Sequence, residues 1–181
     1  MSHHRAMGFR TATPADAQAI TDLVNSGYRG ESSKRGWTTE ADLLGGQRTD
    51  AEQVLEMIQG AGSRIELACD GAGLAGCVHL EKEASGSCYL GMLTVDPARQ
   101  AGGIGKQLMA HSEEIARRWG CARMRILVIA GRGELLRFYE RRGYARTGAT
   151  EPFPEDDPRS GIPKVKGLKF VELVKPLVPA A

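Results

Sequence analysis

The stretch VDPARQAGGIGKQL, residues 95–108, decides how the rest of the sequence is interpreted. An apolar run precedes it and an amphipathic run follows it, which predicts a junction between a strand and a helix. Gly102, Gly103 and Gly105 lie close together at that junction. Because glycine has no Cβ, it lets the backbone approach a ligand closely, and a helix N-terminus offers N–H groups to an anion. The stretch therefore predicts a turn that binds phosphate.

Two common phosphate-binding motifs do not fit this turn. A P-loop requires G-x-x-x-x-G-K-[ST], but Gln107 follows Lys106 and Gln100 stands where the first glycine belongs. A dinucleotide fingerprint requires G-x-G-x-x-G, but Leu108 occupies the third glycine position. The next predicted strand also ends in VIAG, without the carboxylate that would bind a ribose. Both motifs are therefore excluded.

The remaining pattern is Q-x-x-G-x-G, formed by Gln100, Gly103 and Gly105 directly after a strand. In LTVDPARQAGGIGKQLM, residues 93–109, this pattern resembles the coenzyme A turn of the GNAT superfamily of N-acetyltransferases. A second segment, FYERRGY at 138–144, resembles the C-terminal helix signature of the same superfamily. The resemblance is clear from residue 74 to residue 144, whereas residues 1–73 match in the order of elements only.

The order of predicted elements indicates one α/β domain over residues 1–181 with a mixed sheet. Helices are predicted within 11–28, 49–60, 103–120 and 133–144, where Thr13 caps the first and Thr49 with Glu52 forms a capping box on the second. Strands are predicted at 9–11, at 122–130 and at 168–177 as part of a final pair, and a three-strand antiparallel meander is predicted at 64–70, 74–83 and 87–95. The resemblance implies a mostly antiparallel central sheet, flanked by helices and splayed open at the coenzyme A site.

The resemblance also implies roles for individual residues. Tyr139 stands at the position of the general acid that protonates the leaving thiolate, a task that a phenol with a pKa near ~10 can perform. Acetyl-CoA is the implied co-substrate. Its pantetheine arm and pyrophosphate would contact Leu93, Thr94, Val95, Gln100, Ala101, Gly102, Gly103, Ile104, Gly105 and Lys106.

The general base is left open by the sequence. The predicted strand RMRILVIA holds no carboxylate, and Arg132 stands where many members of the superfamily carry an asparagine. Glu81, Glu83 and Glu134 are candidates, although each is more often a solvated surface charge, and a chain of water molecules is an equal alternative. Because no cysteine sits in a Cys–His arrangement, direct attack in a ternary complex is favoured over an acyl-enzyme.

The acceptor is expected between the first helices and the Pro-rich connection at 151–167. Trp37 is the candidate for a wall of this pocket, and an anchoring role in the core is as good an explanation. Glu31, Glu40 and Asp42 would attract an amine, whereas Lys34 and Arg35 would attract a carboxylate. The sequence does not choose between these two electrostatic alternatives, so the acceptor is a primary amine of an unidentified small molecule or peptide.

Composition excludes several other classes of protein. The net charge of +2 over 181 residues is too small for a nucleic-acid binder, and no apolar run is long enough to span a membrane. The four cysteines show no zinc-ligand spacing, which favours reduced thiols in a cytoplasmic protein and no metal site. The resemblance leaves a homodimer open. The alternative to an enzyme is an inactive coenzyme A-binding sensor or regulatory module.

Overall fold

A computed structural model describes residues 6–29, 33–34, 39–159 and 161–178. Within these residues there are four α-helices: α1 (Ala17–Tyr28), α3 (Ala51–Gln59), α4 (Ile104–Arg118) and α5 (Gly133–Glu140). Two 3₁₀ helices, η1 (Pro14–Asp16) and η2 (Pro97–Gly102), precede α1 and α4. The strands are β1 (Gly8–Thr11), β2 (Leu44–Gly45), β3 (Ser63–Asp70), β4 (Gly73–Lys82), β5 (Ser87–Val95), β6 (Arg123–Ile129), β7 (Ala145–Pro152), β8 (Ile162–Pro163) and β9 (Lys169–Pro176).

The described strands form one central sheet and one small sheet. The central sheet has the order β1-β3-β4-β5-β6-β9-β7, and β2 pairs with β8. All neighbours in the central sheet are antiparallel except β5 and β6, which are parallel. This mixed, mostly antiparallel sheet confirms the fold class that the sequence predicts.

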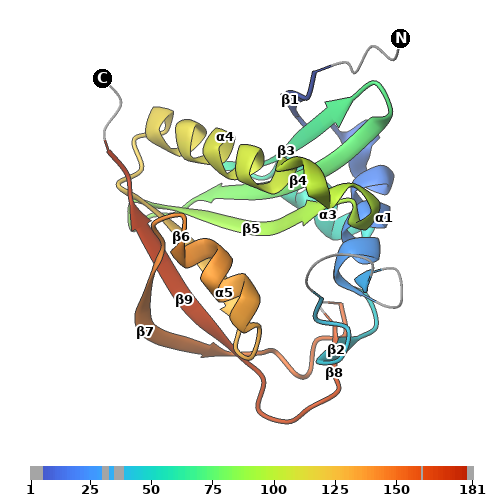
Figure 1. The fold of residues 1–181 in the computed structure, drawn as a ribbon, viewed down its shortest axis with the longest axis vertical. Coiled ribbons are helices and arrows are strands. Elements are labelled where there is room, and N and C mark those ends of the chain that lie inside the picture. The colour runs from blue at the N-terminus through green and yellow to red at the C-terminus, as the bar shows by residue number, and fades with distance from the viewer. Residues whose placement is uncertain (1–5, 30–32, 35–38, 160, 179–181) are drawn as a thin grey trace.

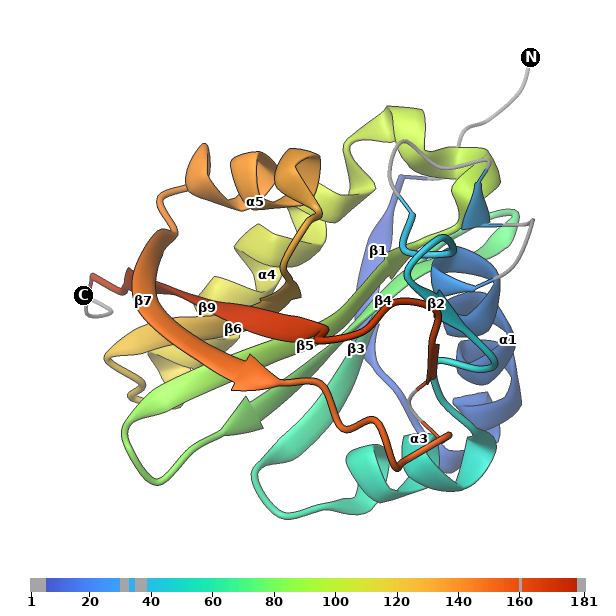
Figure 2. The same cartoon turned by 90° about the horizontal axis from the view of Figure 1, so that it is seen from below.

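Helices cover both faces of the central sheet. Figure 2 shows α4 and α5 on one face and α1 and α3 on the other. A large apolar cluster between the sheet and α4 includes Leu80, Leu108 and Met124, all fully buried. A second cluster packs Ile20 and Val24 of α1 against Ile65 and the rest of the opposite face. The apolar stripes that predict helices 11–28 and 103–120 therefore point into these two cores.

The central sheet opens between β5 and β6. The two strands pair only at their starts, where residues 87–89 align with residues 123–125. Beyond that point β5 continues to Val95 and β6 to Ile129 without pairing, and Figure 1 shows the two halves of the sheet diverging around α5. This confirms the predicted splay, which leaves one edge of β5 open.

A bulge in β5 lies at the start of this opening. Cys77 pairs with Thr94 and His79 pairs with Gly91, so Val78 faces two residues, Met92 and Leu93. Met92 has a φ of +55°, a left-handed conformation that costs free energy for a side chain of this size. The bulge redirects the backbone of β5 where it leaves β6.

Two details differ from the sequence prediction. The N-cap of α3 is Asp50 rather than Thr49, because the Asp50 carboxylate accepts from the Gln53 N–H at 2.8 Å. The Thr49 hydroxyl instead donates to the Gln53 side chain at 3.0 Å. The connection at 151–167 is also partly ordered by pairing, since β8 within it joins β2.

Candidate active site

The predicted phosphate turn is a short 3₁₀ helix followed by the start of α4. The Asp96 carboxylate accepts from the Ala98 N–H at 3.0 Å and begins η2, while the Gln100 amide donates to the Val95 carbonyl at 3.2 Å. Gly103 then adopts a φ of +72° as the N-cap of α4, a conformation that favours glycine. By helix geometry the N–H groups at 103–106 have no acceptor within α4. Four donors and the positive end of the helix dipole therefore gather at one point.

A cavity of about 320 Å³, the donor cavity, begins at this turn. It is bounded by the end of α1, the open edge of β5, the turn and α5. Its lining residues are Gly27, Tyr28, Leu93, Thr94, Val95, Gln100, Gly103, Gly105, Lys106, Arg132, Leu135, Phe138, Tyr139 and Arg142. Seven of the ten residues implied for coenzyme A are in this lining; of the others whose side chains the structure describes, Gly102 and Ile104 are not, and the Ile104 side chain is buried in the core.

The end of α1 forms one wall of the donor cavity because Gly27 allows close packing. A Cβ at residue 27 would lie 2.6 Å from Cγ2 of Thr94 on β5. The next residue, Tyr28, donates its hydroxyl to the Leu93 carbonyl at 2.8 Å. Burial raises the pKa of Tyr28 to about 12, so this hydroxyl is a donor at neutral pH. The helix and the bulged strand are thus joined at the opening of the sheet.

Tyr139 lies on α5 and faces the same opening. Its ring is buried and makes edge-to-face contacts with Phe138 and Tyr144 at 5.4 and 5.9 Å between centroids. Burial raises the pKa of the Tyr139 phenol well above its usual value, while the positive charge of Arg132 opposes that rise. Within the described part of the chain, the Tyr139 hydroxyl has no hydrogen-bond partner and so is available to a ligand.

A second cavity of about 250 Å³, the acceptor cavity, adjoins the first between the diverging strands. Most of its wall is apolar or aromatic and comes from β5, β6 and the C-terminal segment. The two cavities share five lining residues: Tyr28, Leu93, Arg132, Leu135 and Tyr139. The tyrosine predicted as the acid therefore stands where the two cavities meet.

Charged side chains from distant segments meet in the acceptor cavity. Glu40 is buried and accepts from the guanidinium groups of Arg29 and Arg132, the latter at 2.9 Å. Among the described residues, Glu40 is the one carboxylate that lines either cavity. Its two ion pairs connect the end of α1 with the start of α5 across the opening of the sheet.

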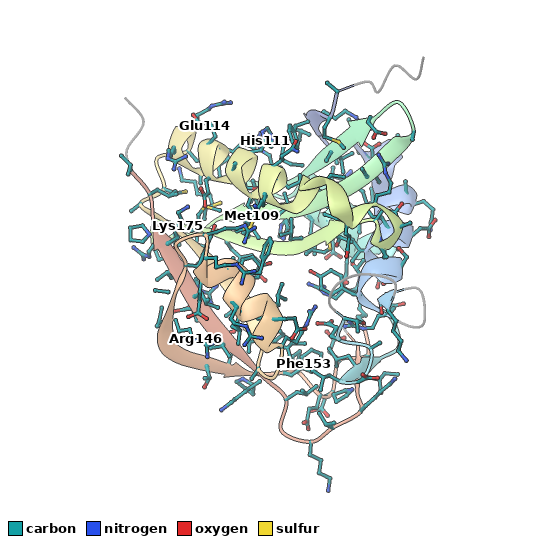
Figure 3. The ribbon with its side chains drawn as sticks, viewed as in Figure 1. Met109, His111, Glu114, Arg146, Phe153 and Lys175 are labelled. Atoms are coloured by element: carbon teal, nitrogen blue, oxygen red, sulfur yellow. The ribbon has the colours of Figure 1, made fainter. Side chains whose placement is uncertain are left out.

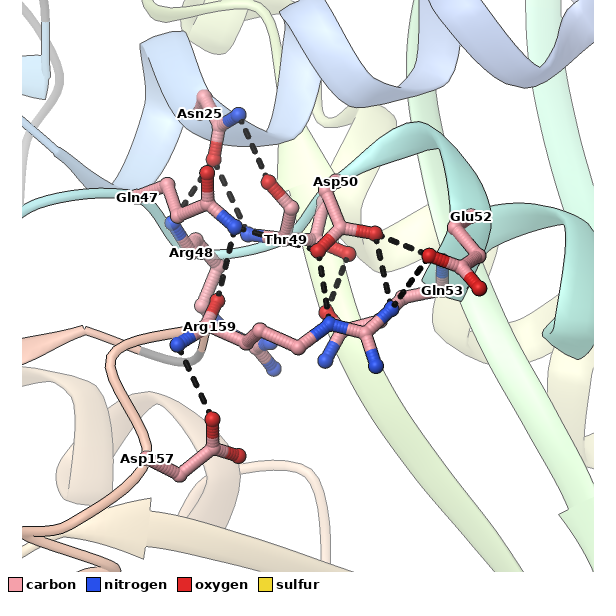
Figure 4. Close-up of polar contacts among 9 residues, drawn as sticks. All are labelled: Asn25, Gln47, Arg48, Thr49, Asp50, Glu52, Gln53, Asp157 and Arg159. Carbon is pink, nitrogen blue, oxygen red and sulfur yellow. Dashed lines mark hydrogen bonds and ion pairs between the residues drawn. The ribbon is translucent and has the colours of Figure 1, made fainter.

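Arg48 is fixed at the rim of the acceptor cavity by its backbone (Figure 4). Asn25 on α1 accepts from the N–H groups of Arg48 and Thr49 at 2.8 and 3.1 Å, and donates to the Thr49 carbonyl at 3.0 Å. The Arg48 guanidinium lies over the Tyr28 ring, 5.3 Å from its centroid. One asparagine therefore holds the backbone at residues 48 and 49, and the Arg48 side chain lines the cavity.

The C-terminal segment closes the acceptor cavity from the other side. Phe153, which follows the end of β7 (Figure 3), and Phe170 on β9 pack with ring centroids 5.6 Å apart. Further along, Arg159 donates to both carboxylate oxygens of Asp50 at 2.9 and 3.1 Å (Figure 4). This ion pair ties the predicted Pro-rich connection to the start of α3.

Several residues predicted for the site lie elsewhere. Trp37, together with Glu31 and Arg35, falls outside the described residues. Neither Glu81 nor Glu134 lines a cavity, and both are exposed. Glu83 pairs with Arg125 at 3.3 Å.

The sequence profile described as the Acetyltransferase (GNAT) family matches residues 24–144, two thirds of the chain. The chain belongs to this family. No curated protein sequence matches the acetyltransferase.

Solved structures share the fold of the acetyltransferase at low sequence identity. An acetyltransferase from Salmonella typhimurium, solved with acetyl-CoA, has a TM-score of 0.68 at 21% identity over 97% of this chain and 96% of that one. A ribosomal-protein-alanine N-acetyltransferase from Brucella melitensis gives 0.69 at 20% identity, over 94% and 99% of the two chains. An N-acetyltransferase from Staphylococcus aureus gives 0.70 at 15% identity, over 96% and 99%.

Most residues of the acceptor cavity of the acetyltransferase could not be recognised in its sequence. Glu40 was one of several charges in a polar segment, and neither Arg48 nor Tyr28 stood out. One usable signal was Gly27 within the last turn of a regular helix, because a helical glycine costs up to about 1 kcal/mol relative to alanine and a packing contact can account for it. Two negative findings apply to the residues that the structure describes. They contain no group of three metal-binding side chains and no helix long and apolar enough to cross a membrane.

Proposed function

We propose that this acetyltransferase moves the acetyl group of acetyl-CoA to a primary amine of a small molecule or peptide, by direct attack within a ternary complex. One observation carries the proposal: a donor cavity that begins at a helix N-terminus meets an acceptor cavity at a buried tyrosine. The names of two structural neighbours, which describe N-acetylation, support a nitrogen acceptor.

The donor cavity fits the parts of coenzyme A. The N–H groups at 103–106 suit a pyrophosphate, and the cationic side chains of Lys106 and Arg142 stand beside them. The backbone of Leu93, Thr94 and Val95, unpaired toward β6, suits the amides of a pantetheine arm. Gly102 and Ile104 would act through their backbone, because neither lines the cavity.

The reaction forms an N–C bond between the amine and the acetyl carbonyl carbon and breaks the C–S bond of the thioester. The amine loses one proton, and the departing sulfur gains one. We assign the second proton to the Tyr139 hydroxyl, which burial keeps protonated at neutral pH and which has no protein acceptor among the described residues. Arg132, which lines both cavities, would offset part of the negative charge that develops on the phenol oxygen.

We do not assign the general base to Glu81, Glu83 or Glu134, because none of them lines either cavity. Glu40 lines the acceptor cavity, but both of its oxygens accept from guanidinium groups. We therefore propose that the amine proton leaves through water. Three further points remain predictions from the sequence. They are a single domain over residues 1–181, a cytoplasmic location and the possibility of a homodimer.

A charge placed at the turn tests the coenzyme assignment. A Cβ at Gly105 would meet Val95 and Phe138 at 3.7 and 3.9 Å, ordinary contacts, so Gly105→Asp is expected to fold. Its carboxylate would favour the N-terminus of α4 but oppose an anion in the donor cavity. Gln107→Asp is the matched control, because residue 107 is exposed in the same helical turn and does not line the cavity.

The measurement is the shift in melting temperature with acetyl-CoA, coenzyme A and NAD(P). We expect acetyl-CoA and coenzyme A to stabilise the wild type and Gln107→Asp, and to have little effect on Gly105→Asp. Stabilisation by NAD(P) but not by acetyl-CoA would contradict the assignment of coenzyme A to the donor cavity. Stabilisation of Gly105→Asp equal to that of its control would move the coenzyme away from this turn.

A further inference from the structure

The described lining of the acceptor cavity holds more positive than negative side chains. Among the described residues its charged lining consists of Arg29, Arg48, Arg132 and Glu40, which leaves two positive charges in excess. Two of the arginines share the Glu40 carboxylate. Such a lining disfavours a polycationic acceptor, because each further ammonium group would enter against this charge in a partly desolvated site.

Arg48 is the arginine of this set that has no carboxylate partner among the residues that the structure describes. Within the described ranges it has no ion pair, and its contact is the face of the Tyr28 ring. Its side chain is half-buried and its backbone is held by Asn25, so its guanidinium N–H donors lie at the cavity on a positioned segment. The charge of Arg48 also acts at Tyr28 and Tyr89, two residues of the lining, where it opposes the rise in phenol pKa that burial causes.

The side chain of Tyr28 connects Arg48 with the opening of the sheet. Tyr28 carries the Arg48 guanidinium on its ring and binds the Leu93 carbonyl with its hydroxyl. Leu93 is also where the donor and acceptor cavities meet. Tyr28 therefore places the Arg48 guanidinium beside the point where the two cavities meet.

The rest of the described lining of the acceptor cavity is uncharged and mostly apolar or aromatic. Its wall includes Leu44, Ile129, Phe153 and Phe170, which are buried or partly buried side chains that offer no charge to a ligand. A volume of about 250 Å³ suits a small molecule with a compact side chain. The cavity thus combines the guanidinium group of Arg48 with a mostly apolar surface.

We propose that the acceptor is an amino acid with an uncharged, apolar side chain, and that Arg48 binds its carboxylate as a specificity-determining residue. This inference rests on the proposed acetyl transfer. A guanidinium matches a carboxylate with two parallel hydrogen bonds, and the apolar wall receives the side chain. A peptide N-terminus lacks a carboxylate next to its amine, so a peptide acceptor is the competing outcome.

Matched acceptors test the inference. L-leucine, L-methionine and L-phenylalanine are each compared with the corresponding amide and decarboxylated amine, with spermidine and an N-terminal peptide as further arms, by release of thiol from acetyl-CoA. The proteins are the wild type, Arg48→Gln and the control Arg146→Gln, whose side chain is about half exposed on β7 (Figure 3). Melting curves with acetyl-CoA show whether each variant is folded and binds the donor.

For at least one of the three sets, we expect kcat/KM of the amino acid to exceed that of its amide and its amine by about 10- to 100-fold, the range that a hydrogen-bonded charge pair gives. Arg48→Gln should remove this preference by lowering the amino acid alone, and Arg146→Gln should keep it. A preference for amides, amines, spermidine or the peptide would overturn the inference and leave acetyl transfer intact. Equal loss for all acceptors in Arg48→Gln would also overturn it.

A binding measurement decides the inference if no acceptor turns over. The melting temperature with coenzyme A is then measured with N-acetyl-L-leucine, N-acetyl-L-methionine or N-acetyl-L-phenylalanine, and with the corresponding amides. Greater stabilisation of the wild type by an N-acetyl amino acid, lost in Arg48→Gln, supports carboxylate recognition. Equal stabilisation by acids and amides, or none, overturns it, whereas a wild type that does not respond to acetyl-CoA overturns the proposed function instead.

Discussion

Replacing Gly27 with alanine tests whether the contact between α1 and β5 shapes the donor cavity. The new Cβ would lie 2.6 Å from Cγ2 of Thr94, so one element must move by about 0.8 Å to reach ordinary contact. Overpacking of this kind costs about 1–3 kcal/mol, while alanine in place of an interior helical glycine returns about 1 kcal/mol. We therefore expect Gly27→Ala to lower the free energy of unfolding by about 1 kcal/mol.

Two further single variants separate the cost of overpacking at Thr94 from the general effect of replacing a helical glycine. Thr94→Ser removes the clashing methyl group and keeps the hydroxyl that donates to the Met92 carbonyl at 3.0 Å. In the double variant the two changes should therefore couple favourably by about 2 kcal/mol, the size of the relieved overpacking. Gly133→Ala is the control, because its Cβ would meet only the flexible end of Arg137 at 3.3 Å, and we expect it to be neutral or stabilising.

Urea unfolding of the four proteins and the wild type gives the free energies, and titration with acetyl-CoA gives the binding constants. A displaced α1 moves Gly27 and Tyr28 in the wall of the donor cavity, so weaker acetyl-CoA binding should accompany the loss of stability and should recover in the double variant. The reasoning is refuted if Gly27→Ala behaves like Gly133→Ala, or if Thr94→Ser does not couple to it.

Three further predictions concern the acid, the C-terminal segment and pH. Tyr139→Phe should lower kcat by about 10²- to 10⁴-fold and leave the acetyl-CoA melting shift unchanged; retained turnover would remove Tyr139 as the acid. Arg159→Gln should change the free energy of unfolding little, because its ion pair with Asp50 is open to solvent, but should raise KM for the acceptor and not for acetyl-CoA. Burial lowers the pKa of His79 to about 4, and the unfolded chain takes up this proton near pH 6.5, so stability should fall by about 2 kcal/mol between pH 7 and 5 on this account. In His79→Gln this acid-dependent loss should be smaller by that amount, and equal pH profiles in urea unfolding would contradict it.

The elements built from local periodicity were predictable from the sequence. Strands predicted at 64–70, 74–83 and 87–95 appear within one residue of those bounds, since alternating apolar residues fix which side of the sheet each residue faces. The turn at Gly103 was predictable for a related reason, because a left-handed residue between a strand and a helix favours glycine. Strand β7 had no such signal; all its residues are exposed at the edge of the sheet.

The parts that the sequence did not predict depend on long-range contacts. The bulge rests on Met92, which adopts a positive φ although nothing in its residue type indicates one. Glu40 and Arg132 are 92 positions apart in the chain and become partners only when the end of α1 and the start of α5 meet. Local patterns therefore located the coenzyme turn, whereas the acceptor cavity required the tertiary fold.

The most direct test of the central claim is thiol release from acetyl-CoA that depends on an added primary amine. The assay uses the amino acids, amides, amines, spermidine and peptide described above with the wild type, Gly105→Asp and Gln107→Asp. We predict amine-dependent release by the wild type and Gln107→Asp, and release near background by Gly105→Asp. A wild type that is stabilised by acetyl-CoA but releases no thiol with any of these amines would contradict the claim and identify a coenzyme A-binding module without turnover.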